Sequence, residues 1–267
     1  MKVKSVSLRW AALLLLAGAF VPVLTACAPG AGDPSGQSES SGPIVGVLID
    51  QTCDATDAMR DWGRRAVETG VTTAAASSGT FMGEAVTTAE YQDGAADVLK
   101  QFSSEMRSSA AQSDDLEAQA DEFLAGSDVE GLVTPEASDC GSDLLGAMAA
   151  LSQSIGDEAK SGERSKDIVF VTNGIVIDDE RGWNFVRDDM TPEYVKTVIT
   201  EMRKEGTFPD LSGVAVQFVG LGEREKPLTA KKKAEIQAFW AEFASASGAG
   251  PIEDLGNVDQ LRLPLEE

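Results

Sequence analysis

The sequence predicts an α/β fold in which a doubly wound, mostly parallel central sheet carries helices on both faces. Short, almost wholly apolar runs rich in branched residues recur along the chain, as expected of strands that are buried on both faces. Between these runs lie segments whose apolar residues repeat at helical spacing. Strands that alternate with helices in this way form parallel sheets with a helical layer on each side.

The expected strands are three apolar runs and one less regular segment. The apolar runs are residues 43–50, 167–172 and 213–220. The less regular segment is Thr80 to Thr88, which could hold one or two strands toward the sheet edge. It is followed by Ala95 to Leu124, which we expect to be helical with an interruption near Ser113. Because ligands of parallel sheets bind beyond the carboxyl ends of the strands, candidate site residues should follow these runs.

Three amphipathic helices are expected in the second half of the chain. Thr191 and Pro192 supply the N-cap and the first-turn proline of the second helix, and Gly248 can end the third. The three apolar stripes are Leu144, Met148, Leu151 and Ile155; Val195, Val198, Ile199 and Met202; and Ile236, Phe239, Trp240 and Phe243.

The first 26 residues have the composition of a signal peptide. Lys2, Lys4 and Arg9 precede an apolar stretch from Trp10 to Leu24. This stretch is about fifteen residues long, whereas a membrane-spanning helix needs roughly twenty. The residues Leu24-Thr25-Ala26-Cys27 then resemble the signal of bacterial lipoproteins, in which the cysteine receives a diacylglycerol and becomes the first residue of the mature protein.

The lipoprotein resemblance implies that Cys27 carries the lipid and holds the protein at the extracytoplasmic face of the cell membrane. The alternative is a secreted protein in which this cysteine is coincidental. Residues 28–43 are rich in Gly, Ser and Pro, and we expect them to form an unfolded tether on the order of 20 Å in reach. The chain thus divides into a signal peptide at 1–26, a lipidated cysteine and tether at 27–43, and one folded domain at 44–267.

The composition excludes several functions. The full sequence has a net charge of −22, and cleavage of the signal peptide removes only positive charges, so nucleic acid is not an expected partner. The chain contains no histidine, which excludes Ser-His-Asp and Cys-His catalysis within it. We therefore expect binding rather than enzymatic catalysis.

The chain has three cysteines, an odd number. If Cys27 is acylated, Cys53 and Cys140 remain as a possible disulfide pair in an oxidising compartment. Closing a loop of this length would stabilise the fold by roughly 4 to 5 kcal/mol in the chain-entropy model. Two buried free thiols are the alternative.

Three short motifs should meet at the carboxyl edge of the sheet. They are Asp50-Gln51-Thr52-Cys53-Asp54 after the first strand, Cys140-Gly141-Ser142-Asp143 before a helix, and Val171-Thr172-Asn173-Gly174 at the end of a later strand. Their order and context resemble the von Willebrand factor A domain, whose metal-ion-dependent adhesion site uses loops at these three places. The resemblance covers most of residues 44–248.

The resemblance implies a divalent cation, Mg²⁺ or else Mn²⁺ or Ca²⁺, held by oxygen ligands with one position open for a partner's carboxylate. The implied metal ligands are Asp50, Thr52, Asp54, Ser142 and Asn173. Two of them depart from the family's pattern, because Asp54 stands where a serine is usual and Asn173 where an aspartate is usual. Asp54 adds a carboxylate and Asn173 lacks one, so the number of carboxylates at the site could stay the same.

A metal-free loop cluster is the alternative to the cation site. Asp54 could instead cap the helix that contains Met59 and Trp62, and Asp50 could accept only backbone N–H groups. Cys53 and Cys140 lie inside or beside two of the candidate loops, so a disulfide would fasten those loops together with or without a metal.

The predicted function is a membrane-anchored, extracytoplasmic binding module for a protein partner of unknown identity. One alternative is a metal-assisted phosphohydrolase of the haloacid-dehalogenase type, whose motifs Asp50-Gln51-Thr52 and Thr172-Asn173 resemble. Another is a solute-binding lipoprotein, for which the chain is short. The acidic loop from Asp178 to Asp189, around Trp183 and Phe185, either recognises a partner or is solvated charge over aromatic residues that pack inward. We interpret Lys231-Lys232-Lys233 as a solvated helix start.

Overall fold

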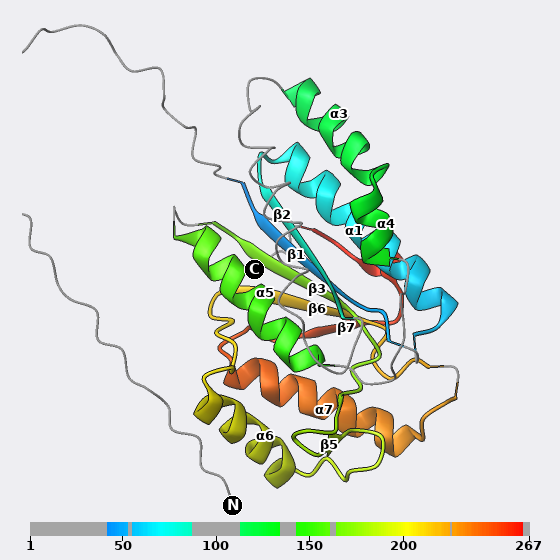
Figure 1. The fold of residues 1–267 in the computed structure, drawn as a ribbon, viewed down its shortest axis with the longest axis vertical. Coiled ribbons are helices and arrows are strands. Elements are labelled where there is room, and N and C mark those ends of the chain that lie inside the picture. Colours follow the sequence, from blue (N-terminus) through cyan, green and yellow to red (C-terminus); the bar gives the residue numbers. More distant parts are fainter. Residues whose placement is uncertain are drawn as a thin grey trace, which may run out of the picture. The chain divides into compact units, whose positions relative to one another are not determined.

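The computed structural model describes residues 42–52, 55–86, 113–133, 143–160, 164–224 and 226–263. The predicted signal peptide and most of the predicted tether lie outside these ranges. The folded part is built on a five-stranded sheet in which every neighbouring pair of strands is parallel (Figure 1). The predicted doubly wound, mostly parallel sheet is therefore confirmed.

From one edge to the other, the sheet strands are β2 (Thr80–Val86), β1 (Ile44–Asp50), β3 (Lys166–Val171), β6 (Val214–Val219) and β7 (Glu253–Leu255). β1, β3 and β6 match the three expected apolar runs to within one residue at each end, whereas β7 was not predicted. In β1 all seven residues are buried, because helices cover both faces of this central strand. The less regular segment does form a strand, β2, at one edge of the described sheet.

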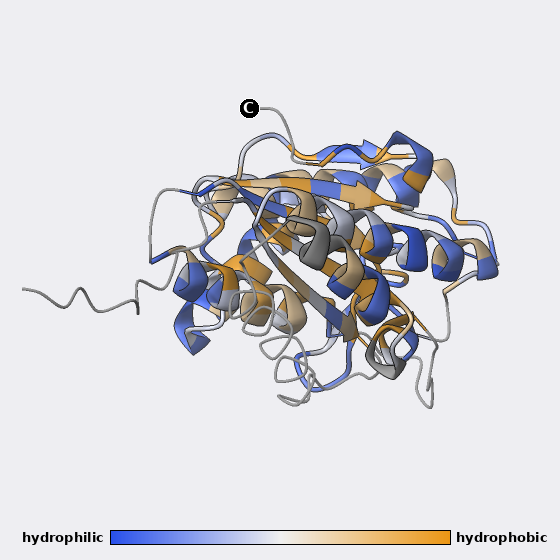
Figure 2. Cartoon of the chain, turned by 90° about the horizontal axis from the view of Figure 1, so that it is seen from above, coloured by the Kyte–Doolittle hydropathy of each residue, from blue (hydrophilic) through white to orange (hydrophobic). Residues whose placement is uncertain are grey.

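Two hydrophobic clusters lie on opposite faces of the sheet. Alternate residues of β1 contribute to one or the other: Ile44 and Leu48 to the first, Val45, Val47 and Ile49 to the second. The first cluster includes residues of α5 (Leu144–Ala159), α6 (Pro192–Glu205) and α7 (Ala230–Ala246). The second includes α1 (Asp57–Ala76), α3 (Ser113–Leu124), α4 (Ser127–Val133) and the short helix η1 (Val258–Gln260). Figures 1 and 2 show this arrangement, with mostly hydrophobic strands between helices of mixed hydropathy.

The helix boundaries follow the capping residues. Thr191 accepts a hydrogen bond from the Tyr194 N–H and Pro192 begins α6, as expected. Gly206 ends this helix in the left-handed conformation, at φ 75°. Gly248, at φ 86°, follows the Ser247 cap of α7 as expected. All twelve residues named in the predicted helical stripes are buried.

One connection among the described residues departs from a simple alternation of strands and helices. Between β3 and α6 the chain forms a small antiparallel hairpin, β4 (Ile177–Asp178) with β5 (Trp183–Asn184). Of the segment expected to be helical from Ala95, the structure describes only the part from Ser113, where α3 begins.

Candidate functional site

The strand order creates a switch point between β1 and β3. From β1 the chain runs outward to β2, and it later returns to the other side of β1, where β3, β6 and β7 follow. In open parallel sheets, ligands bind in the crevice beyond the carboxyl ends of the strands at such a point. The residues that end β1 and follow β3 are Asp50 and Thr172.

The Asp50 carboxylate joins these two strand ends. Its Oδ1 accepts hydrogen bonds from the Thr52 N–H at 3.1 Å and the Thr52 hydroxyl at 2.8 Å. Its Oδ2 accepts a hydrogen bond from the Thr172 hydroxyl at 2.9 Å. Asp50 is only 2% exposed, and a buried carboxylate is stable only when its oxygens are satisfied in this way. The metal-free interpretation expected Asp50 to accept only backbone N–H groups. Asp50 in fact also accepts hydrogen bonds from two side-chain hydroxyls.

Thr172, rather than the predicted Asn173, faces Asp50. The Asn173 side-chain oxygen accepts the Ile175 N–H at 2.8 Å and closes a local turn. Alternation along β3 explains the difference, because Thr172 continues the face of Phe170 and Asp50 continues the face of Leu48, which both belong to the first core cluster. The period of the strand could have indicated Thr172 from the sequence.

The turn after β3 is fastened to the loop after β6 and to α7. The Gly222 N–H donates to the Asn173 carbonyl at 2.8 Å, and the Trp240 indole N–H donates to the Gly174 carbonyl at 2.9 Å. Gly174 has φ 74°, a conformation that glycine adopts at little cost. The third motif is thus held rigidly at the edge of the sheet.

Gln51 is a further buried polar residue that the sequence did not single out. Its side-chain amide donates to the carbonyl of Leu132 and joins α4 to the end of β1. Its side-chain oxygen has no hydrogen-bond partner among the residues that the structure describes. Because Gln51 follows Asp50 in an extended segment, it points toward the opposite face, so it braces the first loop without joining the Asp50 cluster.

The structure brings three of the five predicted ligand residues to the same sheet edge. Asp50, Thr52 and Asn173 are all buried there. Asp54 and Ser142 lie outside the described residues. The alternative role of Asp54 as a helix cap is wrong, because the cap of α1 is Thr56, whose hydroxyl accepts the Met59 N–H at 3.2 Å.

The three cysteines also lie outside the described residues. Lipidation of Cys27 and the disulfide between Cys53 and Cys140 therefore stay predictions. Within the described ranges, no helix is both long and apolar enough to cross a bilayer. Among the same residues, no three acidic, histidine or cysteine side chains gather as a metal cluster.

The chemistry available at this edge is that of hard oxygen ligands. Asp50 supplies a carboxylate, and Thr52 and Thr172 supply hydroxyl oxygens, which are ligand types that Mg²⁺ and Ca²⁺ accept.

Searches against protein-family models and against curated proteins find no match to this chain.

Proposed function

We propose that the chain is a membrane-anchored, extracytoplasmic binding module that captures a protein partner at the carboxyl edge of its sheet. The observation that carries the proposal is the contact of 2.9 Å between Asp50 and Thr172, because it joins the two strand ends that flank the switch point. Ligands of this fold class bind at that place.

We further propose that a divalent cation, Mg²⁺ or else Mn²⁺ or Ca²⁺, joins the site when the partner binds. Asp50, Thr52 and Thr172 would hold the cation, and a carboxylate of the partner would complete its shell together with water. Thr172 joins the proposed set because its hydroxyl lies against Asp50, whereas Asn173 turns its oxygen toward the Ile175 N–H. The Thr172 hydroxyl also accepts the Gly174 N–H at 2.9 Å, and it keeps one lone pair for a cation.

The candidate site lies away from the point at which the proposed tether would join the domain. The described chain begins at Gly42, beside the amino end of β1, whereas Asp50 ends the same strand. A strand of seven residues spans roughly 20 Å, so the proposed attachment does not occupy the Asp50 edge.

A thermal melt of residues 42–267 tests the cation. The midpoint is measured with chelator and then with Mg²⁺, Mn²⁺ or Ca²⁺, since a ligand of the native state raises it. We expect a rise in the wild type, none in Asp50→Ala, and an unchanged rise in Asp210→Ala, which removes an exposed acid in the loop before β6. Each variant is compared with its own chelator baseline. Equal midpoints for the wild type in every condition would remove the cation from the proposal.

A cell-fractionation experiment tests the anchor. Replacing Cys27 with alanine should release the full-length protein from membranes, because the lipid is the proposed means of attachment. Unchanged membrane retention of the variant would contradict lipidation at this residue.

A further inference from the structure

The connection between β3 and α6 is a compact flap, defined here as residues 175–190. Its hairpin tip is tied to α6, because Arg181 forms an ion pair with Glu205 at 3.0 Å and the Trp183 indole donates to Glu201 at 3.2 Å. Phe185, which is fully buried, packs edge-on against Phe239 of α7 with ring centroids 4.5 Å apart. The aromatic residues of the acidic loop therefore pack inward.

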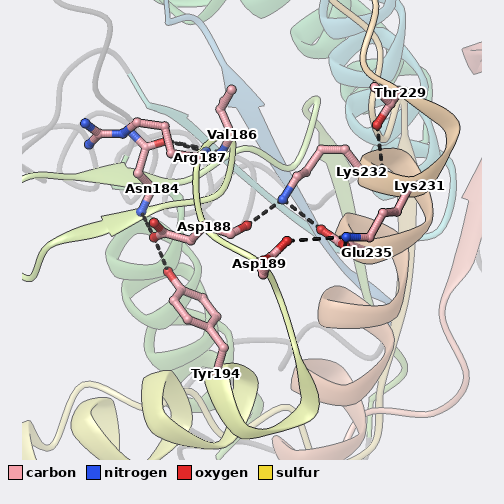
Figure 3. Close-up of polar contacts among 10 residues, drawn as sticks. All are labelled: Asn184, Val186, Arg187, Asp188, Asp189, Tyr194, Thr229, Lys231, Lys232 and Glu235. Atoms are coloured by element: carbon pink, nitrogen blue, oxygen red, sulfur yellow. Dashed lines mark hydrogen bonds and ion pairs between the residues drawn. The ribbon is translucent and has the colours of Figure 1, made fainter.

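Asp188 is the polar centre of the flap's second half (Figure 3). Its carboxylate accepts the Asn184 N–H at 2.8 Å and the Tyr194 hydroxyl at 3.0 Å. Its main-chain carbonyl accepts a hydrogen bond from the ammonium group of Lys232. One residue thus joins β5, α6 and α7.

The sequence suggested that the three lysines at the start of α7 are solvated. In the structure they differ in exposure and in their partners. The Lys232 side chain is only 15% exposed and also pairs with Glu235 at 2.7 Å. Lys231, which is largely exposed, pairs with Asp189 of the flap at 3.4 Å and with Glu235 at 3.2 Å. Lys233 pairs with Glu223, which lies outside the flap, at 2.8 Å.

This placement is electrostatically unusual. The first turn of a helix carries a partial positive charge and disfavours lysine. Three consecutive lysines there are tolerated because each one has an acidic partner. The ammonium groups of Lys231 and Lys232 lower the pKa of the Glu235 carboxyl, so Glu235 stays ionised beside them.

We propose that Lys232 clamps the flap to α7, so that the flap and the first turn of α7 form one rigid wall beside the carboxyl edge of the sheet. The clamp acts through the Asp188 carbonyl, with Lys231 as a weaker and salt-sensitive support. The flap begins one residue after Gly174, whose carbonyl is held by Trp240, so it is fixed at its root by α7 and at its far end by the lysines. The inference concerns the loops that flank the proposed site, but it does not require that the site bind a cation or a partner.

Hydrogen exchange followed by mass spectrometry tests the clamp on the full chain without any added ligand. In Lys232→Met, peptides covering residues 184–191 should exchange faster on the order of tenfold or more, because a partly buried, charge-assisted hydrogen bond is lost. Lys233→Met is the matched control. This variant removes a neighbouring lysine in the same helix turn, and the acidic partner of that lysine is not in the flap. The exchange rate of these peptides should therefore stay unchanged.

Salt provides a second measurement that needs no variant. Raising the ionic strength screens the exposed Lys231 pair much more than the partly buried Lys232 contact. Exchange of residues 184–191 in the wild type should therefore rise only slightly with salt. Equal exchange in Lys232→Met and Lys233→Met would overturn the proposal. If Lys232→Met does not fold, a large increase of wild-type exchange with salt would overturn it instead, and a small one would support it.

Discussion

Replacing Gly174 with alanine tests how the third motif is held at the sheet edge. Gly174 has φ 74°, and this conformation costs alanine roughly 1 kcal/mol more than glycine. A Cβ at this position would lie 2.6 Å from Leu221 Cδ2 and 2.6 Å from Trp240 Nε1, so at least one neighbour must move. Both neighbours are almost completely buried.

The steric part of the effect is larger than the conformational part. Overpacking of a well-packed core costs about 1 to 3 kcal/mol. Displacing the indole also weakens its hydrogen bond of 2.9 Å to the Gly174 carbonyl, which is worth about 1 kcal/mol or more when a buried acceptor is left unsatisfied. We expect Gly174→Ala to lower the free energy of unfolding by roughly 3 to 5 kcal/mol in total.

Gly182→Ala is the matched control, because Gly182 has φ 71° and a Cβ added there would meet no atom of the described residues within 4 Å. It should cost only the conformational part, roughly 1 kcal/mol. Urea unfolding with linear extrapolation measures both variants, and an unchanged slope shows that the denatured state is unaffected. Equal losses in the two variants would refute the steric argument, since they share the backbone conformation and differ only in their surroundings.

Two further predictions concern residues that hold the domain together. Arg164 is almost fully buried and donates to the Gly42 carbonyl at 2.6 Å, to Glu158 at 3.0 Å and to the Thr80 hydroxyl at 2.8 Å. Arg164→Met should therefore cost about 3 to 5 kcal/mol in urea unfolding, whereas loss of the surface pair in Lys160→Met should cost about 1 kcal/mol or less. Burial, and then the hydrogen bond to Asp188, raise the pKa of the Tyr194 hydroxyl, so the folded state favours its neutral form. The resulting stabilisation is present below the ordinary tyrosine pKa of about 10 and is lost as the pH rises above it. Tyr194→Phe should therefore show a shallower decline of the unfolding free energy at alkaline pH than the wild type. Parallel alkaline profiles would contradict this assignment.

Much of the fold could be predicted because its strands and helices carry strong periodic patterns. The run from Ile44 to Asp50 is apolar throughout, and α6 has both a threonine cap and a first-turn proline. The weak pattern after Thr80 left the number of strands open, and the structure describes one, β2. The hairpin of β4 and β5 was not anticipated, since each of its strands has only two residues and so presents no period.

The candidate site was predictable only in part. The positions of Asp50 and Asn173 at one sheet edge followed from their places after buried strands. Which of Thr172 and Asn173 faces Asp50 depends on the side of the strand to which each side chain points. The prediction followed the family motif and named Asn173, whereas the alternation of side chains along the strand indicates Thr172. The role of Lys232 could not be read locally, because its acceptor is the carbonyl of Asp188, 44 residues away in the sequence.

The sequence by itself determined the layered α/β architecture, because burial on both faces requires apolar strands and one-sided burial requires amphipathic helices. It also limited the chemistry that is available, since a chain without histidine cannot build a Ser-His-Asp or Cys-His catalytic site from its own residues. Only the tertiary structure decided which polar groups meet. Contacts such as Asp50 with Thr172 depend on strand order and register, and these arise from packing between segments that lie far apart along the chain.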